Sequence, residues 1–339
     1  MRNFKKPILA LILIGIVTAV LSVAMVYAYI KKSTQEFDIP VRNAYAGQID
    51  TLFVGMSEMR QAAVPAVIDE KCGTFSYNLS GGWQSLYATI MLLEEELARN
   101  DVKTLVLELS STVISLTPDN DYREGSTLVI PRLMSTEERI DYIKNWTLKG
   151  NPIKNYLGFV QKEGMRMVGV YDLNTTVQDK GFCPYYSVDA AISIEQAKET
   201  FAKEQSGRLT PENAERIRSI AQMCKDRGIR LICVTPIMSP AYILTKSGWD
   251  DTRADIQNIC NEIGADYIDF NLIKDRFTLF DDHTSFGEYD HLSEAGAYVF
   301  SPLFAEVIAG AQNDEAIEFD SYDNYIDMMK DSPYGELYD

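Results

Sequence analysis

Histidine is the scarcest acid–base side chain in this sequence of 339 residues, because only His283 and His291 are present. Cysteine is also infrequent, and no C-x-x-C pair or other metal-like spacing occurs among Cys72, Cys183, Cys224, Cys233 and Cys260. We therefore expect no metal and no other cofactor, and we expect the cysteines to be small buried side chains. A Cys72–Cys183 disulfide is an open alternative if these residues lie outside the cell.

Positive charge is in short supply, with 32 basic residues against 49 acidic ones and a formal net charge of −17. Nucleic-acid binding needs a basic surface, so nucleic acid is excluded as a partner. The charges are unevenly spread: residues 1–32 carry five basic side chains and no acidic one, whereas residues 313–339 carry nine acidic side chains and one lysine. We expect that acidic tail to be a solvated, mobile extension. Its interspersed tyrosines and methionines leave docking on the body as an alternative.

One long uncharged run, residues 7–30, lies between a basic N-terminus and Lys31-Lys32. A helix of this length measures about 36 Å, enough to cross a hydrocarbon core of about 30 Å. A signal peptide has a shorter apolar core of about 7–15 residues, although Val26-Tyr27-Ala28 resembles a weak cleavage site. We interpret residues 1–32 as a cytoplasmic N-terminus and transmembrane signal-anchor, followed by a stalk over residues 33–48. This predicts a single-pass protein of the cell membrane with its large domain extracellular.

After the stalk, short apolar segments alternate with amphipathic ones. Strands are predicted at 50–57, 74–80, 103–109, 229–235 and 266–270. Helices are predicted at 83–100, 210–227, 253–263 and 293–308. The alternation predicts an α/β fold with three layers and a parallel five-stranded sheet over residues 49–312. Residues 111–205 break the rhythm, and we interpret them as an insertion that covers the site or forms a small subdomain.

Ser57 directly follows the first predicted strand, at the start of a helix. In parallel sheets the working residues lie beyond the carboxyl ends of the strands, and Gly81, Gly82 and Ser110 also follow strands. Ser57 is therefore the candidate nucleophile, although it could simply cap the helix. A serine hydroxyl is a weak nucleophile and needs an adjacent base.

The candidate base is His291, within Asp290-His291-Leu292-Ser293. Glu288 and Asp290 are the carboxylates that could orient its imidazole, and the sequence leaves both open. A surface histidine near a helix start is the alternative for His291. The other histidine, His283, is interpreted as an ordinary loop residue, with a second base or a metal ligand as the alternatives.

Backbone and side-chain donors near the second and third strands could complete such a site. The amides of Gly81 and Gly82 could stabilise an oxyanion, and the same glycines could form a tight turn with positive φ. Asn78 could donate a hydrogen bond to a substrate or cap the strand end, and Ser110 is a further candidate for substrate binding. Glu58, together with Arg60, could form an ion pair at the site edge or lie exposed on a helix.

Three segments resemble the sequence blocks of the SGNH/GDSL hydrolase superfamily. They are Phe53-Val54-Gly55-Met56-Ser57, Tyr77 to Trp83, and Tyr289 to Ala297. The resemblance covers roughly residues 48–112 and 208–310. It is strongest to the membrane-anchored extracytoplasmic branch, which is similar to the teichoic-acid D-alanylation protein and to alginate O-acetylation proteins. It implies a flavodoxin-like three-layer fold with Ser57 and His291 catalytic and an acid three residues before the histidine.

The sequence departs from that pattern in three places. Gly55-Met56-Ser57 stands where Gly-Asp-Ser is usual, and the acid at the third position before the histidine is Glu288 rather than aspartate. The usual oxyanion asparagine after the third strand has no counterpart, because this strand ends in Glu108-Leu109-Ser110-Ser111.

The resemblance implies a serine esterase or O-acyltransferase that acts on acyl groups of a cell-envelope glycan or an acylated carrier. It also implies a possible membrane-bound O-acyltransferase as partner. The alternative is a non-catalytic accessory or glycan-binding subunit of such a system, which the missing asparagine favours. An anchored solute-binding receptor is a weaker alternative, because it gives no reason for the serine–histidine pair.

Overall fold

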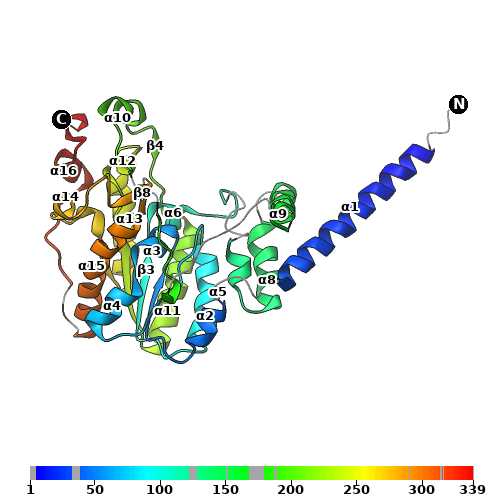
Figure 1. The fold of residues 1–339 in the computed structure, drawn as a ribbon, viewed down its shortest axis with the longest axis horizontal. Helices are drawn as coiled ribbons and strands as arrows, with labels where there is room; N and C mark the ends of the chain where they lie inside the picture. Colours follow the sequence, from blue (N-terminus) through cyan, green and yellow to red (C-terminus); the bar gives the residue numbers. More distant parts are fainter. Residues whose placement is uncertain are drawn as a thin grey trace.

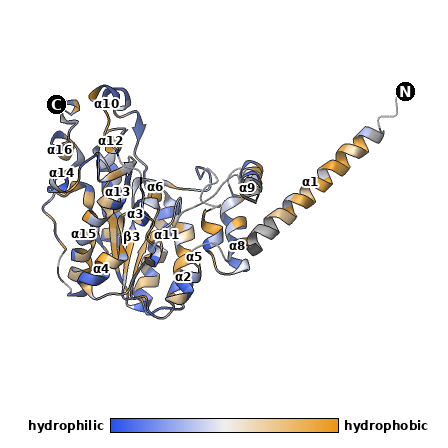
Figure 2. Ribbon diagram, viewed as in Figure 1, coloured by the Kyte–Doolittle hydropathy of each residue, from blue (hydrophilic) through white to orange (hydrophobic). Residues whose placement is uncertain are grey.

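The computed structural model describes residues 5–32, 39–121, 128–149, 152–167, 179–186, 189–288, 290–313, 315 and 317–338. A long helix, α1 (Lys5–Lys32), projects from an α/β body (Figure 1). Within α1 the stretch Pro7–Met25 is apolar and long enough to cross a membrane, as far as length and composition can show. Figure 2 shows this helix as an almost continuous hydrophobic rod. In the described part of the chain, it is the one helix with these properties.

The body is built on a five-stranded parallel sheet, as the sequence predicted. Its strands lie in the order β2-β1-β3-β5-β7. Their bounds are β1 (Thr51–Val54), β2 (Ser76–Asn78), β3 (Thr104–Glu108), β5 (Arg230–Thr235) and β7 (Asp266–Asp269). The register pairs Phe53 of β1 with Asn78 of β2 and with Val106 of β3, so the carboxyl ends of these three strands lie at the same edge of the sheet.

Alternate side chains of the strands pack against helices on opposite faces of the sheet. Leu52 and Val54 belong to a core shared with α5 (Leu86–Leu97), α11 (Pro211–Arg227) and α13 (Trp249–Ile263). Phe53 points the other way, into a core shared with α3 (Ser57–Ala62), α4 (Pro65–Cys72) and α15 (Glu294–Gln312). This period of two, with both faces apolar, is the pattern of a sheet buried between two helical layers.

Local sequence signals explain the clearest helix boundaries. The Thr210 side chain accepts a hydrogen bond from the Asn213 amide at the start of α11, and Pro211 is the first helical residue. Gly228 ends α11 with a φ of 67°, in the left-handed region that glycine adopts without strain. Ser293 caps α15 in the same way as Thr210 caps α11, through the amide of Gly296. These boundaries agree with the prediction for both helices.

The predicted insertion is mostly short helices. They are α6 (Ser111–Ser115), η2 (Ile130–Arg132), α8 (Thr136–Tyr142), η3 (Ile143–Thr147), α9 (Pro152–Met167), η4 (Asp179–Gly181) and α10 (Ile194–Thr200). Its residues 181–186 return to the body: the Cys183 amide bonds the Arg60 carbonyl of α3, and the Tyr185 carbonyl accepts the Glu294 amide of α15. This part of the insertion therefore lies between two elements that flank the predicted site.

The remaining elements connect the strands and the last helices. They are α2 (Ile39–Ala44), β4 (Glu204–Gln205), α12 (Pro240–Ile243), β6 (Lys246–Ser247), η5 (Phe270–Leu272), α14 (Arg276–Leu279), β8 (Phe286–Glu288) and β9 (His291–Leu292). The short α2 is folded and lies in the segment predicted as a stalk, of which residues 33–38 are outside the described part. The pair β8–β9 is an antiparallel hairpin directly before α15.

The expectation of a mobile acidic tail was wrong for the described residues of 313–339. The tail forms α16 (Tyr325–Lys330) and η6 (Gly335–Leu337), and its Tyr325 and Met328 are buried in a core with Trp249. The Tyr325 ring stacks on Trp249 with centroids 5.5 Å apart, and its hydroxyl donates to Asp269 at 2.9 Å. The aromatic and methionine side chains between the acidic residues supply enough apolar surface to dock the tail.

All five cysteines are free, so the possible Cys72–Cys183 disulfide does not form in this structure. Four of them are buried, as expected for small apolar side chains, and Cys72 is partly exposed.

Candidate active site

Ser57 is the first residue of α3, immediately beyond the carboxyl end of β1. The turn between them passes very close to β3. A Cβ on Gly55 would lie 2.3 Å from Oε2 of Glu108, so the turn requires a residue without a side chain at this position. The Gly55 of the sequence motif is therefore explained by close packing, since its φ is not in the left-handed region.

Glu108, the last residue of β3, holds the turn between β1 and α3 through hydrogen bonds. It is fully buried, and its Oε2 accepts hydrogen bonds from the amides of Met56 at 2.7 Å and Met59 at 3.2 Å. These amides flank Ser57 on both sides. Burial raises the pKa of Glu108 to about 8, and the nearby charge of Glu58 adds to the rise, against opposing hydrogen bonds that include one with Ser110. The nucleophile turn is thus held by a carboxyl that favours its neutral form near pH 7.

His291 lies on β9, which packs against α3. Its Nδ1 is 3.0 Å from Oδ1 of Asp290, and both side chains are largely shielded from solvent. Burial acts to raise the pKa of Asp290, but the hydrogen bond and charge of His291 outweigh it, so the pKa is lowered. Asp290 is therefore an ionised partner that can fix the imidazole orientation. The backbone of Glu288, the alternative acid, pairs with His291, and its side chain lies outside the described part of the structure.

Glu58 is buried, which contradicts the expectation of an exposed side chain on the helix. It is 6% exposed, and Ser57 Oγ donates a hydrogen bond to its Oε2 at 3.2 Å. Burial raises the pKa of Glu58, the charge of Asp290 raises it further, and His291 opposes the rise. Because α3 packs against β9, this carboxyl contacts the serine hydroxyl and is also within reach of the charges of Asp290 and His291.

The two glycines differ in what their amides do. The Gly81 amide donates to the Gly55 carbonyl at 3.2 Å, so this N–H is already engaged within the turn. For the Gly82 amide, no hydrogen bond is found within the described residues. Neither glycine has a positive φ, whereas Trp83 does, at 53°. The tight turn expected at the glycines is therefore made by Trp83, and Gly82 remains the candidate for an oxyanion donor.

Asn78 has a structural role. Its Nδ2 lies 3.0 Å from the carbonyl of Met59 within α3 and 2.9 Å from the carbonyl of Ala63 directly after α3. With these donors engaged, Asn78 anchors α3 to β2 and has no amide hydrogen left for a substrate. Ser110 caps α6, since its side chain accepts the Val113 amide at 3.5 Å.

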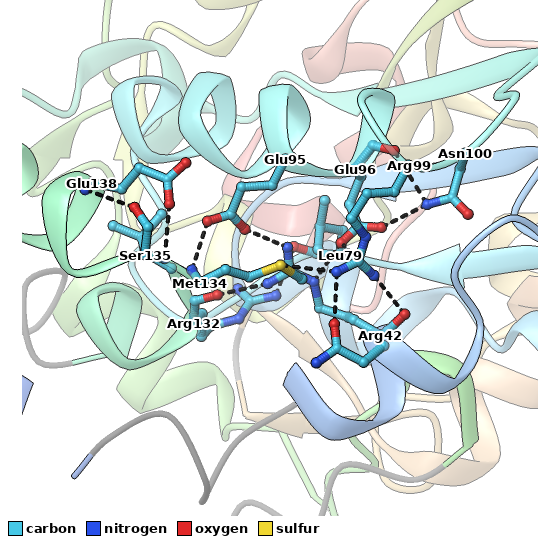
Figure 3. Close-up of polar contacts among 12 residues, drawn as sticks. Arg42, Leu79, Glu95, Glu96, Arg99, Asn100, Arg132, Met134, Ser135 and Glu138 are labelled. Carbon is cyan, nitrogen blue, oxygen red and sulfur yellow. Dashed lines mark hydrogen bonds and ion pairs between the residues drawn. The ribbon is translucent and has the colours of Figure 1, made fainter. Parts of the chain in front are cut away.

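A buried network holds the glycine segment from the side of the insertion. Arg132 donates to the Leu79 carbonyl at 2.9 Å and to Gln84 Oε1 at 2.6 Å. Its own carbonyl accepts a bond from Arg42 at 2.6 Å, and Arg42 also pairs with Glu95 and Glu96 (Figure 3). The glycine segment is thereby fixed to α2, α5 and the insertion.

Two aromatic residues next to the site carry no motif that could have revealed them. Tyr185 of the insertion stacks on His291 with ring centroids 5.9 Å apart and an angle of 23° between the planes. Tyr242 of α12 has its pKa raised by burial and then by the charges of Asp290 and Glu58, so its hydroxyl lies near the carboxyl group of the site. Lys246 bonds that hydroxyl at 2.8 Å.

The second histidine is apart from this cluster. His283 is exposed, and its Nδ1 is 3.0 Å from Asp189. Among the described residues, no group of three or more His, Cys, Asp or Glu side chains is arranged to hold a metal ion.

Comparison with known proteins gives little beyond this geometry. No protein-family model matches the chain, and no curated protein matches it. Among solved structures, the chain is similar to the lipase/acylhydrolase from Enterococcus faecalis, at 9% identity and a TM-score of 0.36, over 78% of this chain and 97% of that one. A likeness of this size is uninformative about the chemistry of the site. The fold itself defines the class: an α/β protein with a parallel five-stranded sheet between two helical layers and one apolar N-terminal helix.

Proposed function

We propose that this chain is a membrane-anchored serine esterase or O-acyltransferase of the SGNH type. The observation that carries the proposal is the pairing of His291 with Asp290 on a hairpin that packs against α3, the helix that begins with Ser57. A nucleophile, a base and an acid that orients the base are the minimum for acyl transfer through a serine. The packing of α3 against β9 supports the proposal, because these two elements are far apart in the sequence.

The mechanism follows from these positions. Ser57 Oγ attacks the carbonyl carbon of an acyl ester, and His291 takes the serine proton through Nε2 while Asp290 holds Nδ1. The amides of Ser57 and Gly82 stabilise the negative charge on the carbonyl oxygen. The bond to the alcohol then breaks, and His291 returns the proton to the leaving oxygen. Water releases the acyl group in a hydrolase, and a sugar hydroxyl accepts it in a transferase.

The substrate class and location belong to the same proposal. The apolar helix α1 supports anchoring in the cell membrane, with the large domain extracellular, and an acyl group on a cell-envelope glycan or carrier is the substrate in reach of such a domain. A membrane-bound O-acyltransferase is the proposed partner. The single membrane-spanning helix would lie in the same bilayer as this enzyme and could contact it there.

A non-catalytic accessory subunit is the second candidate function. The engaged amides of Gly81 and Asn78 favour it, since they leave fewer donors for an oxyanion than an efficient esterase uses. In this alternative Ser57 only begins α3, and the same edge of the sheet binds a glycan or an acyl carrier.

Active-site labelling of the full chain in detergent micelles separates the two functions. The reagent is a fluorophosphonate, which reacts with activated serines. We expect labelling of the wild type, none in Ser57→Ala and a strong decrease in His291→Ala, with Ser219→Ala, exposed on α11, as a serine control that keeps labelling. A folded wild-type protein that stays unlabelled, alone and together with a membrane-bound O-acyltransferase, would favour the accessory subunit.

A further inference from the structure

The serine turn contains one more carboxyl than a serine–histidine–acid site needs. Asp290 already holds Nδ1 of His291, yet Glu58 is also buried beside the serine, with its Oε2 3.2 Å from Ser57 Oγ. Burying a carboxyl costs free energy unless it is neutral or paired with a cation. The position of Glu58 therefore suggests a role in the reaction and not in stability.

The groups that face Glu58 come from each element packed around it. They are Asp290 and His291 beside β9, Glu108 of β3 and Tyr242 of α12, and Lys246 of β6 acts on Asp290. Burial and the charge of Asp290 raise the pKa of Glu58, whereas His291 lowers it less. The surroundings thus favour the neutral acid over the carboxylate.

We propose that Glu58 is a positioning residue for the nucleophile: as a neutral acid it holds the Ser57 hydroxyl beside His291, and as a carboxylate it holds that hydroxyl unproductively. This inference rests on the proposed esterase function and deepens it. A neutral carboxyl forms a weak hydrogen bond with Ser57, which the hydroxyl readily exchanges for His291. A carboxylate is a stronger acceptor and competes with His291 for the serine proton.

This role has a consequence for the dependence of the rate on pH. Activity requires neutral His291, which gives a rise with pH, and neutral Glu58, which gives a fall at higher pH. Glutamine has the size and hydrogen-bonding atoms of the neutral acid but does not ionise. Glu58→Gln should therefore keep the rise and lose the fall, whereas Glu58→Ala should also lose the fall but react about tenfold more slowly than Glu58→Gln at every pH.

The experiment measures fluorophosphonate labelling rates of the full chain in detergent micelles from about pH 5 to about pH 9. The matched control is Glu70→Gln, because Glu70 is exposed on α4. We expect a bell-shaped profile for the wild type and Glu70→Gln, and a profile without the alkaline fall for Glu58→Gln. A wild-type rate that rises to a plateau overturns the proposal and needs no variant. The same alkaline fall in Glu58→Gln also overturns it.

A second readout is independent of catalysis. The shift in melting temperature caused by Glu58→Gln is measured across the same pH range, once with Ser57 present and once in Ser57→Ala. If wild type is never labelled, the esterase function fails, and this comparison alone decides whether the two side chains interact. A shift that depends on Ser57 supports the contact, and a shift that does not depend on Ser57 overturns the positioning role.

Discussion

Two groups of buried carboxyls in this protein differ in what neutralises them. Glu95 and Glu96 are paired with the buried guanidinium of Arg42, at 2.6 and 2.7 Å (Figure 3). Glu58 and Glu108 are also buried, but Glu58 faces the carboxyl of Asp290 and the imidazole of His291, and Glu108 faces Glu58. The first group, with a matched cation, holds α2, α5 and the insertion together. In the second group, burial and then the neighbouring acidic charge raise the pKa values of Glu58 and Glu108 at the carboxyl edge of the sheet, as is common in functional sites.

The largest expected effect is a loss of reaction rate, and it should be found only for residues of the candidate site and not for the group around Arg42. Ser57→Ala and His291→Ala should each lower the rate of ester hydrolysis or labelling at least about 1000-fold while changing the free energy of unfolding by less than about 1 kcal/mol. Urea titration beside the labelling assay tests both parts. A His291→Ala protein that retains a tenth of the wild-type rate would show that the imidazole is not the base.

Replacing Arg42 should have the opposite profile. Arg42→Met leaves Glu95 and Glu96 buried without their cation, so we expect a loss of about 3–5 kcal/mol in the free energy of unfolding. The rate per folded molecule should change little. The control is Arg230→Met, since Arg230 pairs with Asp266 on the surface with both side chains 43% exposed, and the expected loss is about 1 kcal/mol or less. Equal losses for both variants would contradict the structural role of Arg42.

Glu108 should make stability depend on pH. Its pKa is raised to about 8, so the folded protein binds a proton that the unfolded chain releases near its ordinary value. This contribution is fully present below about pH 4 and is lost as the pH rises through about 8. Glu108→Gln should flatten that loss by about 2–4 kcal/mol between about pH 5 and 8, as measured by urea unfolding. Parallel curves for wild type and variant would show that Glu108 is ionised throughout.

The smallest expected effect concerns the ring over the imidazole. Tyr185→Leu removes a stacking contact worth about 0.5–1.5 kcal/mol, so we expect a rate about 3–10-fold lower. Tyr45→Leu removes a comparable contact with Phe75, directly after α2 and away from the site, and should reduce stability without a change in rate. A rate in Tyr185→Leu equal to that of wild type would mean that the ring only covers the histidine.

Local signals in the sequence predicted most of the fold. The five strands, the caps of α11 and α15 and the placement of Ser57 beyond β1 depend on periodicity and on residues a few positions apart. A mobile tail was expected, with docking only as the alternative, because its charge is visible in the sequence, whereas the surface that receives Tyr325 is formed by Trp249 and Asp269 from elsewhere in the chain. The sequence of an acidic segment with interspersed apolar residues does not indicate the surface on which it docks.

Parts of the candidate site could not be predicted from the sequence, because they too depend on contacts between distant segments of the chain. Tyr185 reaches His291 only because the insertion returns between α3 and α15, and no spacing within the insertion encodes that path. Glu108 had a usable signal, since a single acid ends an otherwise apolar strand. The inward direction of Glu58 depends on how α3 meets β9, which is a tertiary contact.

The docking of α16 has a consequence for any change made near this segment. Asp269 ends β7 as a buried carboxyl, and one of its hydrogen bonds comes from Tyr325, 56 positions further along the chain. All five strands of the sheet precede α16. A chain cut before α16 would therefore keep every strand but lose this donor and the apolar cover that Tyr325 and Met328 give to Trp249. A deletion or a bulky tag at this position would act on the edge strand of the sheet, far from the site of the change in sequence.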